Sequence, residues 1–190
     1  MTKKKPLTPR QRELFNALLR DFLVEGFESF TIDNASKRYH CSKSTIYGLG
    51  TTRDEILTRI LVSYFKEISR RTAPEITPGT SFIQAFTDYF DDIKEALSAG
   101  SPKFMKDLAN DPVAREIYAI NTKAATGIIH DLLERGVKSG EFTIDSIPFA
   151  SRLIQQAMED IQQGTYSDVL ETKEAYANLG QLILNGLRKS

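Results

Sequence analysis

The sequence predicts an all-α protein of 190 residues, with an N-terminal three-helix unit and a larger C-terminal helical domain. Apolar residues recur at spacings of three and four along most of the chain, which is typical of helices with one buried face. No stretch alternates apolar and polar residues as a half-buried strand would. Residues that favour helix starts stand before these apolar patterns, and glycine or proline stands behind them.

Composition narrows the class of protein. The single cysteine excludes an internal disulfide framework, and no apolar run reaches the roughly 18 residues that a membrane span needs. The N-terminal residues are basic, but they lack the apolar core of a secretion signal. We therefore expect a cytoplasmic protein without membrane contact.

Charge is divided unevenly along a chain whose formal net charge is zero. Up to Arg53 there are ten lysines and arginines against five acidic residues, whereas the remainder has 15 basic and 20 acidic residues. A basic first quarter suggests a module that binds a polyanion. Because three of the ten charges are the consecutive Lys3, Lys4 and Lys5, a solvated tail is the alternative explanation.

The first helix is predicted from Pro9 to just before Gly26. Thr8 is a suitable N-cap, proline is favoured at the first helical position, and glycine favours a stop. The apolar residues fall on one face of this helix: Leu14, Phe15, Leu18, Leu19, Phe22 and Leu23.

Two short helices follow, over residues 31–39 and 42–47, with a tight turn between them. Thr31 and Ser42 are their N-cap candidates. This spacing is typical of a helix-turn-helix, in which the second helix protrudes and can enter the DNA major groove. Lys43 and the hydroxyls that follow it would project from the first turn of that helix, toward phosphate oxygens or base edges.

A connecting helix is predicted next. Thr52 is its N-cap, with Glu55 three residues on in a capping box, and it ends near Arg71 because prolines follow. We therefore expect a helix-turn-helix domain over 1–52, a connecting helix over 52–72 and a second domain over 73–190.

Helices also fill the second domain. One helix is predicted from Phe82 to Leu97, a short one after Pro102, and a long one from Asp111. The expected apolar face of the long helix is Val113, Ile117, Ile120, Ala124, Ile128 and Leu132.

The last two helices have the spacing of coiled-coil seams. We expect them to form a four-helix bundle with a second copy of the chain, although both seams could instead pack on the central helices. The expected interface residues are Ile147, Ala150, Ile154, Ala157, Ile161, Tyr176, Leu179 and Ile183.

The run GFESFTIDNASKRYHCSKSTIYGLGTTRDEIL resembles the helix-turn-helix of the TetR (tetracycline-repressor) family of transcriptional regulators. The positions that match the family pattern are Gly26-Phe27, Thr31, Ser42, Thr45, Ile46, Tyr47, Asp54, Glu55 and Leu57. His40 departs from it, because the family usually has glycine in this turn. Gly48-Leu49-Gly50 also departs from it, where the family prefers polar and aromatic residues.

The resemblance implies roles for individual residues in binding double-stranded DNA. Thr31 and Tyr47 would contact phosphates, and Arg53 would replace a lysine that reaches the DNA backbone. The expected DNA-binding residues are Thr31, Ser42, Lys43, Ser44, Thr45, Tyr47 and Arg53.

The resemblance also implies a cavity for a small-molecule effector in the second domain. Because no charged cluster lies on the presumed inner faces, we expect a neutral or mostly apolar effector. The expected lining residues are Phe86, Tyr89, Phe90, Phe104, Met105, Tyr118, Asn121 and Thr122. At this helical spacing, the aromatic residues and the methionine could instead belong to the core.

The sequence therefore predicts a homodimeric repressor that binds a near-palindromic operator and is released by its effector. We expect no catalytic residues, cofactor or metal, because no phosphate-binding loop, nucleophile motif or metal-ligand pattern is present. The alternative is a helical ligand carrier or protein-interaction dimer whose helix-turn-helix is structural, and Gly48-Leu49-Gly50 favours it.

Overall fold

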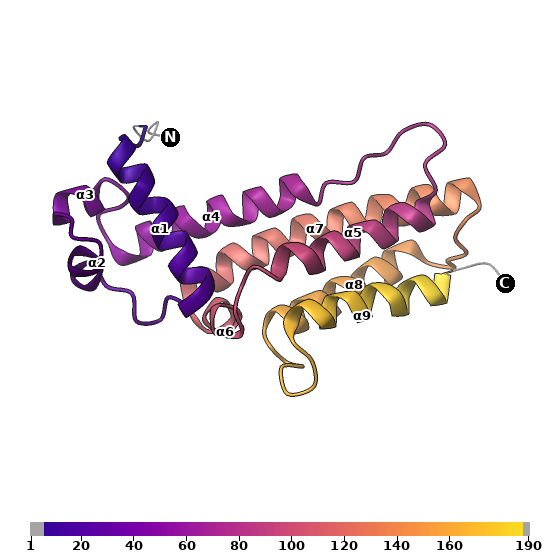
Figure 1. Ribbon diagram of the computed structural model, residues 1–190. Coiled ribbons are helices and arrows are strands. Elements are labelled where there is room, and N and C mark those ends of the chain that lie inside the picture. Colours follow the sequence, from indigo (N-terminus) through magenta and orange to yellow (C-terminus); the bar gives the residue numbers. More distant parts are fainter. Residues whose placement is uncertain (1–5, 188–190) are drawn as a thin grey trace.

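A computed structural model describes residues 6–187, and this part of the chain folds into nine α-helices (Figure 1). Lys3, Lys4 and Lys5 lie outside the described residues. The helices are α1 (Pro9–Glu25), α2 (Ile32–Arg38), α3 (Lys43–Tyr47), α4 (Arg53–Arg71), α5 (Phe82–Leu97), α6 (Pro102–Asn110), α7 (Pro112–Ser139), α8 (Ile147–Gln162) and α9 (Thr172–Leu187). The all-α prediction is confirmed.

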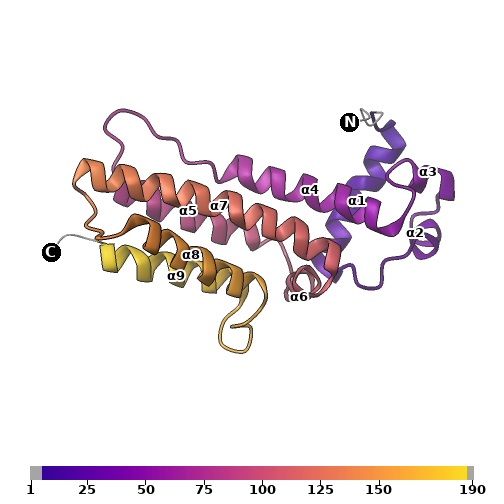
Figure 2. The same ribbon diagram turned by 180° about the vertical axis from the view of Figure 1, so that it is seen from behind.

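The molecule has a small head and a long body, joined by α4 (Figures 1 and 2). The head is formed by α1, α2 and α3, and the body by α5 to α9. In the body α9 packs on α5 and α8 packs on α7, while α4 packs on α7. The short helix α6 lies against α1 at the end of the body that faces the head.

Side-chain caps start the helices where the sequence predicts them. The hydroxyls of Thr31, Ser42 and Thr52 each accept a hydrogen bond from the amide three residues on. Thr8 forms a reciprocal capping box with Gln11. At the start of α4 the carboxylate of Glu55 reaches the residue before the N-cap, where it accepts hydrogen bonds from the amide and the hydroxyl of Thr51.

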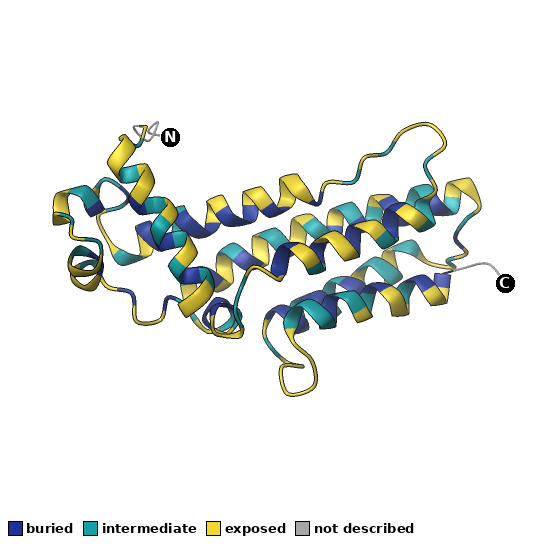
Figure 3. Ribbon diagram, viewed as in Figure 1, coloured by how far each residue is buried: buried dark blue, intermediate teal, exposed yellow. Residues whose placement is uncertain are grey.

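One apolar core runs from the head into the body (Figure 3). Phe27 lies after α1, and its ring packs edge-on against Phe104 of α6, with the ring centroids 5.8 Å apart. Phe104 in turn packs against Tyr64 of α4 at 5.4 Å. Since Phe27 and Phe104 are almost fully buried, these contacts form a dry connection between the head and the body.

The predicted apolar face of α7 is only partly right. Leu132 is buried, and Val113, Ile117 and Ile128 pack against the core while partly exposed. Ile120 is 66% exposed, whereas Tyr118, Thr122 and Thr126 face the core. Polar residues can lie inside because their hydrogen bonds are made there: the Thr122 hydroxyl donates to the side chain of Gln162 over 2.8 Å, and the Thr126 hydroxyl to a backbone carbonyl.

Three of the expected interface residues need the same correction. Ile154, Ile161 and Tyr176 are buried within one chain, so they are core residues and not part of a surface for a partner. The helical period was right, but both faces of α8 carry apolar residues. The face that stays exposed includes Phe149 and Leu153.

The described residues, 6–187, include no helix that is both long and apolar enough to cross a membrane. Within the same range, no three histidine, cysteine, aspartate or glutamate side chains come together as a metal site would require.

Candidate functional site

The turn between α2 and α3 has a left-handed backbone at His40, with φ of 46°. This is the conformation that glycine adopts most easily, which explains why the resembled family prefers glycine here. The turn is held by the Ser36 hydroxyl, which donates to the carbonyl of Cys41 over 2.6 Å. The Tyr39 hydroxyl donates to Asp21 of α1, so the pair of short helices is fixed to the rest of the head.

The exposed face of α3 carries hydroxyls, one lysine and one tyrosine. Ile46 is fully buried and anchors the helix, while Tyr47 is 46% exposed. The hydroxyl of Ser42 forms hydrogen bonds with the hydroxyls of Ser44 and Thr45, with oxygen–oxygen distances of 2.7 and 3.0 Å. The structure therefore brings five of the expected DNA-binding residues together on one short helix and its cap: Ser42, Lys43, Ser44, Thr45 and Tyr47.

Lys43 is paired across the turn with Asp33 of α2, with 2.6 Å between the amine and the carboxylate. The hydrogen bond from Lys43 lowers the pKa of Asp33, and Lys37 lowers it further by its charge. Since both partners of the pair are exposed, the pair can open in water at little cost. Thr31 lies at the start of α2, where its hydroxyl caps the helix.

The departure at Gly48-Leu49-Gly50 has a packing reason. Leu49 is buried in the head core, and a Cβ atom on Gly50 would lie 2.8 Å from the backbone nitrogen of Ile56. Arg59 of α4 donates to the carbonyls of Gly48 and Leu49 over 3.1 and 3.2 Å. Arg59 of α4 therefore satisfies the backbone carbonyls at the end of α3, and no polar side chain of residues 48–50 is needed there.

Arg53 does not lie on the α3 surface, and its expected contact with the DNA backbone stays a prediction. Its guanidinium pairs with Asp111 at the start of α7 over 2.9 Å and donates to the carbonyl of Phe27 over 3.4 Å. No sequence pattern predicts this pair, because Asp111 is 58 residues from Arg53. Among the described residues of the head, Arg12, Arg20 and Lys37 are exposed and form no ion pair; sequence reasoning had counted them only as charge.

A cavity of about 80 Å³ lies in the body between α4, α5 and α7, with α8 and α9 behind it. Four of the expected residues line it: Tyr89, Tyr118, Asn121 and Thr122. Phe86, Phe90 and Phe104 are instead core residues that pack ring against ring, and Met105 lines a separate groove beside α6. These four were expected from helical spacing and from the resemblance, and neither shows which side of a helix faces a hollow.

The lining of this cavity is uncharged but contains hydroxyls and amides. The hydroxyls of Tyr118 and Tyr176 lie 3.3 Å apart, and Tyr176 also donates to the carbonyl of Met158. Burial raises the pKa of Tyr176 to about 12, so it stays neutral. At the edge, Ser69 of α4 donates to Asn121 of α7 over 3.1 Å.

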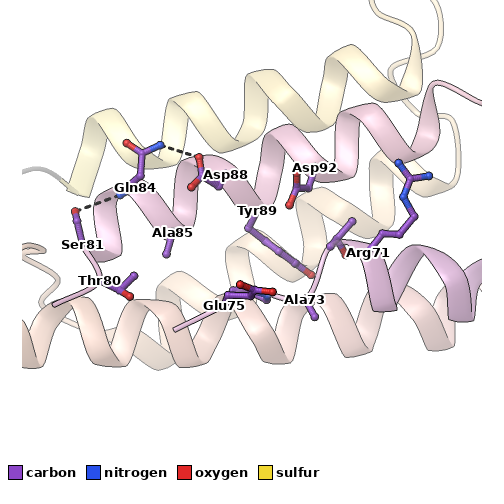
Figure 4. Close-up of a pocket in the computed structure, with 12 residues that line it drawn as sticks. Arg71, Ala73, Glu75, Thr80, Ser81, Gln84, Ala85, Asp88, Tyr89 and Asp92 are labelled. Atoms are coloured by element: carbon purple, nitrogen blue, oxygen red, sulfur yellow. Dashed lines mark hydrogen bonds between the residues drawn. The ribbon is translucent and has the colours of Figure 1, made fainter. Parts of the chain in front are cut away.

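A second hollow, of about 580 Å³, opens between α5 and the loop that follows α4 (Figure 4). Glu75, Asp88 and Asp92 lie along it, with Arg71 at one end. Burial and the neighbouring carboxylates, Asp88 first among them, raise the pKa of Asp92. This outer hollow shares Thr72 and Tyr89 with the inner cavity, so the two are neighbours.

Comparison with known proteins agrees with this architecture. Residues 82–189, more than half of the chain, match the family model described as QacR-like protein, C-terminal region. The chain belongs to the TetR family of transcriptional regulators. Members of this family bind DNA and an effector and are not enzymes.

Solved structures of this family have the same fold. A TetR-family regulator from Agrobacterium tumefaciens superposes with a TM-score of 0.70 at 10% identity, covering 95% of this chain and 98% of its own. One from Rhodococcus sp. gives 0.69 at 13% identity, covering 93% and 100%. The fatty acid degradation regulator of Bacillus halodurans gives 0.66 at 14% identity, covering 98% and 100%. No curated protein sequence matches the chain.

Proposed function

We propose that this TetR-family protein is a homodimeric repressor that binds a near-palindromic operator and is released by a small neutral effector. The observation that carries the proposal is the exposed α3 face, where a lysine, a tyrosine and three hydroxyls lie together at the end of the molecule. Such groups bind phosphates and base edges. Residues 1–52 would form the DNA-binding domain, and 73–190 the effector and dimerisation domain.

Dimerisation would use the free face of α8 and α9, which lie next to each other in both views (Figures 1 and 2). Phe149, Leu153 and Leu182 are 69%, 60% and 74% exposed there. Two such helix pairs can bury these side chains in a four-helix bundle. Of the expected interface residues, Ile147, Ala150, Ala157, Leu179 and Ile183 are partly exposed and stay in the proposal.

Each head of the dimer would then place α3 in a major groove, with the two heads about 34–36 Å apart along the duplex. Lys43 would exchange Asp33 for a phosphate, while Thr31 and Tyr47 contact the backbone. The exposed cations Arg12, Arg20 and Lys37 would add attraction that does not depend on sequence.

The effector would occupy the uncharged cavity. A charged group there would lose its hydration without gaining an opposite charge, so a neutral molecule is favoured. The tyrosine and threonine hydroxyls favour an effector with at least one polar atom. Because drug-sized ligands need roughly 300 Å³ or more, the effector must separate α4 from α7 and break the bond between Ser69 and Asn121.

Release would follow from a shift of populations. An effector that binds better when α4 has moved lowers operator affinity by the difference of its affinities for the two states, and by no more than that. The outer hollow beside Thr72 and Tyr89 provides a route of entry.

The experiment is operator selection from random duplexes, followed by affinity measurements over a range of salt concentrations. Lys43→Ala should weaken binding to all duplexes and reduce the slope of log affinity against log salt by about 0.9. Lys138→Ala is the matched control, because Lys138 is also an exposed lysine in an ion pair, but lies at the far end of α7. Its slope should equal that of the wild type.

A wild-type chain that binds no duplex but takes up neutral ligands would contradict the proposal and support a ligand carrier with a structural helix-turn-helix. Equal salt slopes for Lys43→Ala and the wild type would contradict the proposed docking of α3.

A further inference from the structure

We propose that Asp107, on α6 in the body, is a positioning residue for DNA binding: its carboxylate fixes the orientation of the head relative to the body. This role rests on the proposed function, because it concerns how the head is presented to an operator.

The carboxylate of Asp107 reaches out of the body into the turn after α1. One of its oxygens, Oδ2, accepts from the amide of Phe27 over 2.5 Å and from the amide of Glu28 over 2.9 Å. The side chain is 95% buried and lies 80 residues from Phe27 in sequence. Hydrogen bonds to an ionised acceptor are stronger than neutral ones, and buried amides without a partner are costly.

The turn is shaped to receive this carboxylate. Gly26 ends α1 with φ of 76°, a conformation that glycine adopts without strain. A Cβ atom at Gly26 would lie 2.4 Å from Oδ2 of Asp107, so a side chain there would displace the carboxylate. The absence of a side chain thus allows α6 and the turn to approach each other this closely.

The same turn is held from a second direction. Asp107 binds the amide of Phe27, while Arg53 at the start of α4 binds the carbonyl of Phe27 and pairs with Asp111. Asp111 ends α6 and caps α7. A further hydrogen bond, from the amide of Ser101 to the carbonyl of Leu23, joins the other end of α6 to α1.

These contacts give the head two attachments to the body. One is α4, which follows the head in the chain, packs on α1 and holds the end of α3 through Arg59. The other is the set of bonds that join Asp107 of α6 and Ser101, its N-cap, to residues 23–28. Two separated attachments fix an orientation that one does not, and Asp107 makes the most buried polar contact of the second.

The second attachment also reaches the effector cavity. Asp111 caps α7, and Tyr118, Asn121 and Thr122 of the same helix line the cavity two to three turns further on. A ligand that displaces this part of α7 therefore moves Asp111 and α6 together. Through Asp107 that movement changes the orientation of the head, so regulation would not depend on α4 alone.

The test compares operators whose half-sites differ in spacing by steps of one base pair, built from the duplex that the full-length wild type selects. The wild type should prefer one spacing. Asp107→Ala should lose about 5-fold to 150-fold in affinity at that spacing, as expected when a coupling between sites is removed. It should also bind the neighbouring spacings almost equally, which a simple loss of folded protein would not cause.

The matched control is Glu141→Ala. Glu141 also binds two consecutive backbone amides, those of Phe82 and Ile83, but at the end of the body far from the head. Its removal should lower stability and leave the spacing preference unchanged. Asp107→Asn retains an acceptor oxygen without the charge, and should show an intermediate loss of preference even if Asp107→Ala does not fold.

A spacing preference in both Asp107 variants equal to that of the wild type overturns the positioning role while leaving the proposed function intact. If Glu141→Ala loses the spacing preference as fully as the Asp107 variants do, the positioning role is also overturned, because the loss would then come from lower stability. A wild type that binds no duplex overturns the proposed function, and this role with it.

Discussion

The two ends of the body use the same chemistry for different purposes. At the end beside the head, Asp107 binds two consecutive amides of the turn after α1. At the far end, Glu141 binds two consecutive amides at the start of α5 over 3.0 and 3.2 Å, together with the hydroxyl of Ser81. Asp107 joins the body to the head, whereas Glu141 joins the end of α7 to α5 within the body.

The difference between them is burial and what each connects. Asp107 is 5% exposed and binds the backbone amide of Phe27, whose ring packs on Phe104, while Glu141 is only partly buried. A carboxylate that caps a helix stabilises one element, but a carboxylate between two units also determines their relative orientation. Variants at the junction should therefore alter DNA binding, and variants at the far end only stability.

The largest effect is expected from Phe104→Ala, which removes the apolar part of the junction. Phe104 is fully buried between Phe27 and Tyr64. Its loss should lower the free energy of unfolding by about 3–5 kcal/mol in urea titrations. Tyr166→Ala, in the exposed loop before α9, should change it by less than about 0.5 kcal/mol. A loss under about 1 kcal/mol for Phe104→Ala would show that the junction is not tightly packed.

The next largest effect is expected from Gly26→Ala. It should lower the free energy of unfolding by about 2–4 kcal/mol, because of backbone strain and the clash with Asp107. Gly140→Ala is the control at the far end. Gly140 also has positive φ, but its ψ of 8° is left-handed helical, whereas the ψ of Gly26 is −176°, and no atom lies within 4 Å of the Cβ position of Gly140. It should lose about 1–2 kcal/mol. Equal losses in urea unfolding would contradict the expectation, because both the more strained backbone and the clash with Asp107 belong to Gly26 alone.

Arg53→Gln should have a smaller effect on stability, about 1–2 kcal/mol, because the pair with Asp111 is partly exposed. Its informative readout is the salt dependence of operator binding. If Arg53 belongs to the junction, the slope of log affinity against log salt equals that of the wild type. A slope reduced by about 0.9, as expected for Lys43→Ala, would return Arg53 to the DNA surface.

The smallest effect is the pH dependence at the far end. Burial raises the pKa of Glu141, but bonds from Phe82, Ser81, Ile83 and Ser139 outweigh it, so the pKa lies below the ordinary 4.5. A carboxyl with a lowered folded pKa stabilises the protein fully above its unfolded pKa and loses this contribution as the pH falls through the folded pKa. Unfolding curves on both sides of pH 4.5 should show a shallower loss in acid for Glu141→Gln. An equally steep loss would contradict the role of Glu141.

Local features of the fold could be predicted from the sequence, and contacts between distant residues could not. The caps at Thr8, Thr31 and Ser42 follow from short-range hydrogen bonding, so their helix starts were correct. The inward face of α7 could not be found from hydrophobicity, because Thr122 satisfies its hydroxyl on Gln162 of α8.

The candidate site divides in the same way. The α3 surface is contiguous in sequence and was predicted nearly whole, apart from the exposed cations around it. The true partner of Arg53 is 58 residues away, and the bond from Asp107 to Phe27 spans 80 residues. Neither has a spacing that sequence reasoning can use, because both depend on how α6 lies against α1.

The most direct test of the central claim, that the body orients the head through Asp107, is the distance between the two heads of the dimer. This distance can be measured by double electron–electron resonance between spin labels on Asn16→Cys, an exposed position of α1, after Cys41→Ser removes the natural thiol. We expect one narrow distance distribution for the unaltered junction and for Glu141→Ala, and a shifted or broadened one for Asp107→Ala. An unchanged distribution in Asp107→Ala would contradict it.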